Sequence, residues 1–122
     1  MDLSGTPMAR RKRTFTYEQA LELLPAVAET TQRAVQSLDE LLAIEDAGAE
    51  GDLEVPQELV PEYQRIVGRW AEDVIGLGVE VKGLWLVDFD SGAGYYCWRH
   101  PEESLEYFHG YEEGYKGRVK LN

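Results

Sequence analysis

The chain contains a single cysteine, Cys97, among its 122 residues. One thiol excludes an internal disulfide framework and fits a reducing compartment. The sequence also lacks any apolar run near the ~20 residues that a membrane-spanning helix needs. Basic residues near the N-terminus are not followed by an apolar segment, so no secretory signal is recognisable. We therefore expect a cytoplasmic protein that does not enter a membrane.

Basic residues are scarce outside the N-terminus. Residues 1–13 carry four basic residues and one acid, a net charge of +3. Because the whole chain has a net charge of −11, the remaining residues carry −14. Because so acidic a domain repels phosphate groups, we expect the folded part not to bind nucleic acid. Residues 1–13 themselves, rich in charge with Ser, Gly and Pro, are predicted to form a disordered tail.

Residues 14–78 carry the pattern of a helical hairpin. Thr16 and Gln19 have the spacing of a capping box, so the first helix is expected to begin there. Pro25 lies inside this helix and is expected to kink it or to make it restart, because proline removes one backbone hydrogen bond.

Apolar residues then recur every three or four positions from Leu24 to Leu42, interrupted by Thr31. A helix of about 30 residues would be ~45 Å long, whereas a globule of this size has a radius of gyration near ~14 Å. The hairpin should therefore extend past the rest of the domain. A second copy of the chain would cover its exposed seam, so we expect a homodimer or a larger assembly.

The second helix would begin at Pro56 or near Pro61 and end at Gly78 in a left-handed conformation. After Gly78 the period changes to alternation, which predicts strands at residues 79–89, 95–100 and 104–109. Residues 110–122 contain too many glycines for a stable helix and would form a terminal arm. The prediction is one α+β domain over residues 14–122, a long antiparallel helical hairpin packed on a small antiparallel three-stranded sheet.

The pairing of the last two strands can also be predicted. If Arg99 pairs with residue 104, Gly94 lies opposite His109 and Cys97 lies three positions further along the strand. At the rise of a strand, Cys97 and His109 would then be ~10 Å apart. The same pairing places Tyr107 on the face that packs on the helices, together with Tyr96, Trp98 and Leu105.

Several short motifs resemble a known prokaryotic family. They are Thr16-x-x-Gln19, Leu23-Leu24-Pro25, residues 77–82, Leu86-Val87-Asp88-Phe89, Cys97-Trp98-Arg99, Phe108-His109 and Gly114-Tyr115-x-Gly117-Arg118. Across residues 14–121 they resemble the family catalogued as domain of unknown function 2203. The resemblance implies a long helical hairpin with a small antiparallel sheet, and no established activity. Pro101 and Gly110 depart from the glycine and aspartate usual in that family.

The candidate ligand-binding residues are charged or polar side chains near the aromatic strands, namely Asp88, Arg99, Glu102, His109 and Arg118. A guanidinium and an imidazole rimmed by Trp98, Phe108 and Tyr115 would suit a small anionic or planar ligand. The alternative is that Arg99 and Arg118 form ion pairs that hold the turn and the terminal arm in place.

Cys97, His109 and Glu112 are candidate ligands of a divalent metal, because thiolate, imidazole and carboxylate groups bind zinc. Glu113 is the alternative to Glu112, and Asp88 or Glu106 would complete the set. The alternative is that Cys97 is a small buried apolar residue and His109 a hydrogen-bonded strand end. A Cys–His nucleophile is disfavoured, since acidic surroundings raise the pKa of a thiol.

No motif specifies a reaction, and Gly92-Ala93-Gly94 opens no helix that could cradle a phosphate. The sequence therefore favours a non-enzymatic, homo-oligomeric structural or interaction protein that needs no cofactor. The alternatives are a small-ligand or metal-binding module around Arg99, Glu102 and His109, or an enzyme of unspecified reaction.

Overall fold

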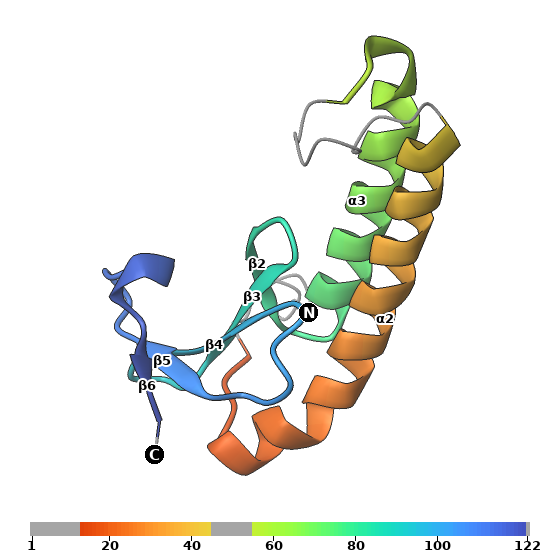
Figure 1. Cartoon of the computed structure of the whole chain (residues 1–122). Coiled ribbons are helices and arrows are strands. Elements are labelled where there is room, and N and C mark those ends of the chain that lie inside the picture. The colour runs from red at the N-terminus through yellow and green to blue at the C-terminus, as the bar shows by residue number, and fades with distance from the viewer. Residues whose placement is uncertain (1–12, 45–54, 122) are drawn as a thin grey trace, which may run out of the picture.

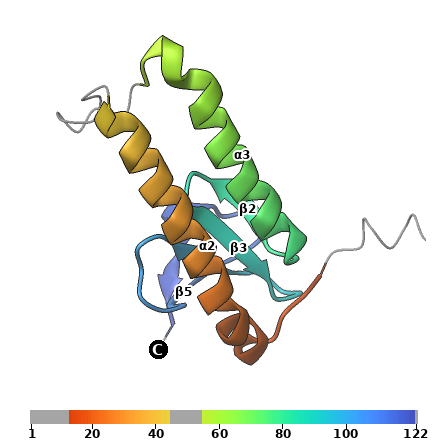
Figure 2. The same cartoon turned by 90° about the vertical axis from the view of Figure 1, so that its right-hand side faces the viewer.

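The computed structural model describes residues 13–44 and 55–121. Its fold is α+β, with two long helices packed side by side against one face of an antiparallel sheet (Figures 1 and 2). The helices are α2 (Tyr17–Ile44) and α3 (Val60–Gly76). Most of the predicted tail at residues 1–13 and most of the predicted loop between the helices lie outside the described residues.

The sheet has five strands in the order β2-β3-β4-β5-β6, which is also their order in the chain. They are β2 (Glu80–Gly83), β3 (Leu86–Asp90), β4 (Tyr95–Arg99), β5 (Tyr107–His109) and β6 (Val119–Lys120). Two 3-10 helices, η1 (Gln57–Leu59) and η2 (Tyr115–Gly117), precede α3 and β6.

The capping box predicted for α2 is confirmed. The backbone N–H of Gln19 donates to Thr16 Oγ1 at 3.0 Å, and the N–H of Thr16 donates to Gln19 Oε1 at 2.9 Å. The prediction that the helix kinks or restarts at Pro25 is wrong in detail, because α2 runs through Pro25 as one element. Leu24 and Val27 on either side of the proline are buried in the core, and this packing holds together the turn that lacks a backbone hydrogen bond.

The ends of α3 also follow the sequence. Pro61 lies in its first turn, where a missing N–H costs nothing, while Pro56 stands before η1. Gly78 has a φ of +91° and follows the last turn, as predicted for a left-handed cap. A Cβ at this position would lie 2.5 Å from Cδ of Arg13, so the Arg13 side chain would also have to move.

The hydrophobic core lies between the helices and the sheet. Side chains from both layers meet there, including Val27 and Trp70 from the helices and Val87, Phe89 and Trp98 from the sheet. These sheet residues alternate along β3 and β4, so the intervening residues face away from the helices. Because one face of the sheet packs on α2 and α3, the alternating residues of β3 and β4 lie on the opposite face.

The prediction of three strands is wrong. Residues 79–89 form the hairpin β2–β3 instead of one strand, with Gly83 paired to Leu86 and a turn at Leu84 and Trp85. Trp85 has a φ of +60°, and its ring lies 4.9 Å from that of Trp70. Packing of the two indoles stabilises a turn that the alternating pattern does not reveal. At the other end, the terminal arm supplies β6, which pairs with β5.

The predicted register of β5 is wrong by one residue. His109 pairs with Tyr95 and Tyr107 pairs with Cys97. The connection from β4 is longer than a tight turn, because Trp98 Nε1 donates to the carbonyl of Glu102 and Leu105 turns into the core. A one-residue shift moves side chains to the opposite face, so Tyr107 lies on the same face as Cys97 and not on the helix side.

Candidate functional site

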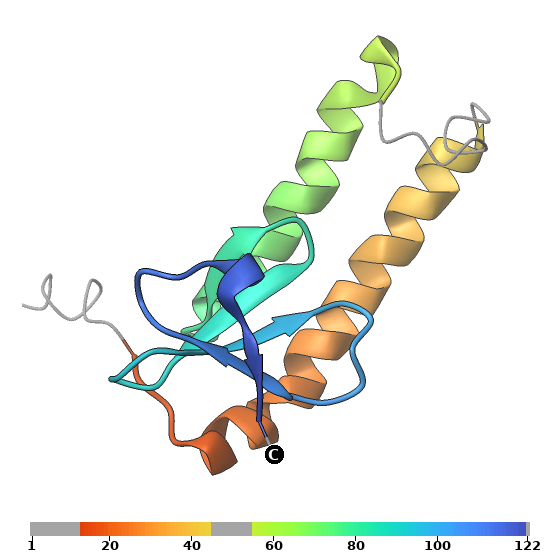
Figure 3. The same cartoon turned by 60° about the vertical axis from the view of Figure 1, so that its left-hand side comes forward.

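The face of the sheet turned away from the helices carries polar side chains from several strands. Figure 3 shows this face, with the segment that carries η2 and β6 in front of it. Asp88 of β3, Cys97 of β4 and His109 of β5 are all buried here. Asp88 pairs directly with Cys97 across the ladder, and His109 lies diagonally from Cys97. The alternation of three neighbouring strands thus places three different chemical groups together.

These three side chains form a compact group. One oxygen of Asp88, one ring nitrogen of His109 and Sγ of Cys97 all lie within 4.8 Å of one another. Asp88 Oδ2 lies 3.0 Å from His109 Nε2 and accepts a hydrogen bond from Lys82 Nζ at 3.1 Å. The predicted separation of ~10 Å between Cys97 and His109 is therefore wrong, because it depended on the incorrect register.

The second ring nitrogen of His109 decides what Nε2 can do. Nδ1 lies 2.8 Å from the carbonyl oxygen of Gly110, which can only accept, so Nδ1 carries a proton. Nε2 then presents to Asp88 either a second proton or its lone pair. Histidines that bind metals commonly donate the other ring N–H to a carbonyl in this way, which orients the lone pair toward the ion.

Asp88 has one satisfied and one unsatisfied oxygen. The residue is 1% exposed, and among the described residues Oδ1 has no hydrogen-bond partner. Leaving a buried polar atom unpaired costs about 1–3 kcal/mol, more when the group is charged. A cation bound to this oxygen would remove that cost.

The surroundings of Cys97 keep its thiol protonated. Burial raises its pKa to about 12, and the neighbouring Asp88 acts in the same direction. Arg118, with Nη1 3.9 Å from Sγ, opposes this rise only in part. At neutral pH the thiol is therefore a poor nucleophile, as the sequence indicated. A coordinated metal ion can nevertheless deprotonate a thiol outright.

A cavity of about 350 Å³ opens onto the three side chains. Its wall is completed by residues from β2, β3 and the segment after β5, namely Lys82, Leu86, Tyr111, Glu112, Glu113, Gly114 and Tyr115. The lining contains the carboxylates of Asp88, Glu112 and Glu113 against one lysine. The charge of the cavity thus favours a cation over an anion.

The five predicted ligand-binding residues fall into two groups. Asp88 and His109 contact each other inside the cavity. Glu102 and Arg118 form an ion pair at 2.8 Å outside it, and Glu102 also accepts the backbone N–H of Arg99 at 2.9 Å. The Arg99 guanidinium is 5.5 Å from the ring centre of Tyr115.

Arg118 joins the two groups, since it contacts Cys97 and stacks over the rings of Tyr107 and Tyr115 at 3.9 and 4.2 Å. Of the predicted aromatic rim, Tyr115 lines the cavity. Trp98 instead faces the helices and belongs to the core, while Phe108 packs on Tyr96 at 5.6 Å on that same side.

The predicted metal ligands Cys97 and His109 belong to the compact group with Asp88, while Glu112 lies on the cavity wall. Glu106, the predicted alternative ligand, is exposed and does not line the cavity. Its Oε1 lies 3.9 Å from Lys120 Nζ.

Sequence reasoning missed Lys82 and Tyr111, whereas Glu113, the predicted alternative to Glu112, also lines the cavity. Lys82 alternates with Val81 on β2, but its place on the polar face follows only from the β2–β3 hairpin, which the alternating pattern does not reveal. Tyr111 donates to Asp90 Oδ1 at 2.7 Å, and Glu113 accepts the N–H of Gly110 at 2.9 Å. These contacts hold the segment after β5 over the cavity. The contact between Tyr111 and Asp90 joins residues 21 positions apart, so it has no local sequence signature.

Comparison with known proteins gives a family but no activity. No curated protein and no solved structure matches the chain. Within the described residues, neither helix combines the length and apolar character that crossing a membrane requires. A family model described as "Uncharacterized conserved protein (DUF2203)" matches residues 13–121, nearly the whole chain. The resemblance seen in the sequence is thereby confirmed, and the chain belongs to the DUF2203 family.

Proposed function

We propose that this protein is a metal-binding module that holds one zinc ion on the polar face of its sheet. Asp88, Cys97 and His109 are the ligands. The observation that carries the proposal is the buried Asp88 Oδ1, which has no partner among the described residues although an imidazole and a thiol lie beside it. An oxygen, a nitrogen and a sulfur ligand together suit zinc better than magnesium or calcium, which prefer oxygen alone.

The surrounding residues support the assignment. The contact of His109 with the Gly110 carbonyl leaves Nε2 directed at the site. Lys82 is the outer hydrogen-bond partner of Asp88. Three protein ligands leave one position of a tetrahedral zinc ion, which Glu112 on the cavity wall or a water molecule would fill.

The proposed role is structural and non-enzymatic. The ion would join β3, β4 and β5 beneath the segment that contains Tyr111 and Tyr115. Arg118 and Glu102 contribute by holding the terminal arm on the sheet through their ion pair. Since a free zinc-binding thiol persists in a reducing environment, we propose that the protein acts in the cytoplasm.

The test is zinc binding by purified full-length protein after its metal has been removed with a chelator. We expect titration calorimetry and elemental analysis to give one zinc ion per chain. The variants Asp88→Asn, Cys97→Ser and His109→Gln should each bind zinc roughly a hundredfold more weakly, since even outer-shell changes cost ten- to a hundredfold. Cobalt in place of zinc should show a thiolate charge-transfer absorption that Cys97→Ser abolishes.

His100→Gln is the matched control, because His100 is the other histidine and lies near Trp98 on the helix side. It should bind zinc as the natural chain does. Failure of the natural chain to retain zinc at micromolar concentration would refute the proposal. So would equal retention by all three ligand variants.

A further inference from the structure

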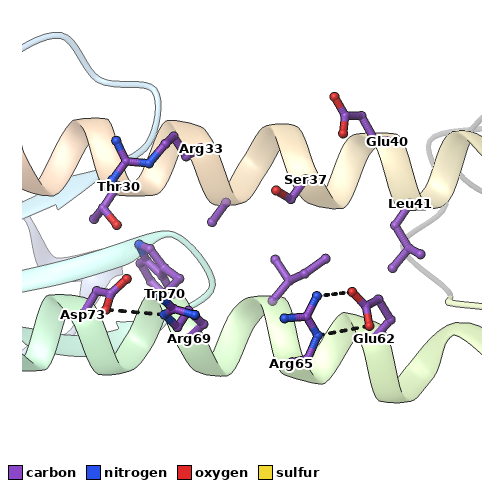
Figure 4. A pocket seen from close by; sticks show the side chains of 12 residues that line it. Thr30, Arg33, Ser37, Glu40, Leu41, Glu62, Arg65, Arg69, Trp70 and Asp73 are labelled. Carbon is purple, nitrogen blue, oxygen red and sulfur yellow. Dashed lines mark hydrogen bonds and ion pairs between the residues drawn. The ribbon is translucent and has the colours of Figure 1, made fainter.

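The helical hairpin extends past the sheet (Figure 1). A groove lies between its two helices (Figure 4). Its volume is about 560 Å³, and none of the residues that line it lines the cavity of the proposed zinc site. Apolar side chains from both helices line it, namely Ala34, Leu41, Ile66 and Trp70. Exposed charged residues flank them on each helix.

On α2, the charged residues that line the groove have opposite signs at its two ends. On α2, Arg33 and Glu40 are seven residues apart, which is two turns and ~10 Å along the helix. On α3, Arg69 and Glu62 have the same separation in the reverse order along the chain. Because the helices are antiparallel, Arg33 and Arg69 lie at the end near the sheet, together with Asp73. Glu40 and Glu62 lie toward the tip of the hairpin, together with Arg65 (Figure 4).

A hydrogen bond between the two helices shows which residues of α2 and α3 lie at the same height along the hairpin. Trp70 Nε1 donates to Thr31 Oγ1 at 2.8 Å. Arg33 and Arg69 lie within two residues of this pair, on the side toward the tip of the hairpin. The midpoint between Arg33 and Glu40 on α2 is therefore at a similar height to the midpoint between Arg69 and Glu62 on α3. On α2 this midpoint falls beside Ser37, a small exposed residue that lines the groove.

We propose that the groove is the interface with a second copy of this chain. A two-fold axis would cross the groove at right angles to the helices, beside Ser37, so that α2 of one copy lies antiparallel on α2 of the other. Arg33 would then face Glu40 of the second copy, and Arg69 would face Glu62 of the second copy. The apolar floor would be buried in a four-helix arrangement.

Charge complementarity selects this antiparallel arrangement. A two-fold axis along the helices that brought α2 onto α2 would place Arg33 beside Arg33 and Glu40 beside Glu40 of the second copy, which is repulsive. The existing partners within one chain are Glu29 for Arg33 at 3.0 Å and Asp73 for Arg69 at 3.9 Å, and Glu62 pairs with Arg65. These pairs are exposed, so they are weak and leave the charges able to engage a second copy.

The first experiment reverses the charges of the full-length protein. Light scattering after size exclusion should give twice the 13.8 kDa of one chain. Glu40→Arg alone and Arg33→Glu alone should each weaken dimerisation roughly tenfold, because two symmetric contacts become repulsive. The double variant Arg33→Glu/Glu40→Arg should restore it. A monomeric natural chain, or a dimer indifferent to all three variants, would overturn the proposal.

The second experiment locates the axis. Under mild oxidation Ser37→Cys should form a disulfide between copies. Asp39→Cys, two residues away on the opposite side of the exposed helix, should not. Both variants retain the buried Cys97, so any cross-linking through that residue would be the same in the two. Equal cross-linking at the two positions would place the interface elsewhere. Repeating the measurement with chelator separates this proposal from zinc binding, because dimerisation through the helices should not need the ion.

Discussion

Thr31 interrupts the apolar seam of α2 with a hydroxyl group that is fully buried. The structure shows why this position is polar. The hydroxyl donates to the Val27 carbonyl at 2.7 Å and accepts from Trp70 Nε1 at 2.8 Å. It therefore satisfies the one polar atom of an indole that is otherwise in the core.

Thr31→Val should destabilise the protein by about 1–3 kcal/mol, because the buried Trp70 N–H would lose its partner while the side-chain volume hardly changes. The measurement is the free energy of unfolding from urea denaturation. Thr31→Ser keeps the hydroxyl and is the control, with a smaller loss caused only by the missing methyl group. Equal losses in both variants would show that packing and not the hydrogen bond makes Thr31 important.

Cys97 should be almost inert toward thiol reagents in the folded, metal-free protein. Its pKa near 12 lies about three units above the ordinary value, so the thiolate fraction at neutral pH falls on the order of a thousandfold. Because the pKa is raised, reactivity should increase as the pH rises toward 12. The measurement is the rate of alkylation of native protein against that of protein unfolded in urea. Comparable rates would contradict the burial described here.

At the level of elements, α2 depends on the capping box that fixes where it begins. Thr16→Ala removes the oxygen that accepts the Gln19 N–H, which leaves an exposed helix end without its cap. We expect a loss of about 0.5–2 kcal/mol in the free energy of unfolding. Thr14→Ala is the control, since Thr14 is exposed and precedes the helix. A loss in the control as large as in Thr16→Ala would argue against a specific cap.

The strands show what a local pattern can and cannot predict. Alternation correctly places Tyr95 to Arg99 in a strand, and the glycine after α3 correctly ends that helix. The same alternation does not reveal the turn at Trp85, because this turn is stabilised by contact with Trp70, fifteen positions earlier in the chain. It likewise does not reveal β6, whose two residues become a strand only by pairing with β5.

At the level of the whole molecule, zinc should stabilise the fold by mass action. At free zinc about a hundredfold above its dissociation constant, the gain is ~2.7 kcal/mol, which raises Tm by roughly 10 °C for a domain of this size. Differential scanning calorimetry of the metal-free protein, with and without zinc, measures this shift. Magnesium should give no comparable shift, because it prefers oxygen ligands. If zinc does not change the Tm of the His109→Gln variant, the stabilisation of the natural chain comes from the proposed zinc site.

The helical hairpin, its caps and the helix–sheet architecture follow from the sequence alone. Their signals are local: the spacing of Thr16 and Gln19, the apolar period of α2 and α3, and the glycine at 78. Each depends on residues within a few positions of one another, where chain geometry is fixed by backbone sterics and hydrogen bonding. The residue types of the site, Asp88, Cys97 and His109, were also identified in this way.

Their convergence was decided by tertiary structure. Whether Cys97 lies near His109 depends on a one-residue difference in strand register, and that register is determined by where Leu105 and Trp98 are buried. Because side chains alternate across a sheet, a shift of one position exchanges the two faces completely. The sequence thus determined the two helices, the presence of a small antiparallel sheet and the chemical groups that are available. Packing of the strands against the helices determined how many strands form and which of those groups meet.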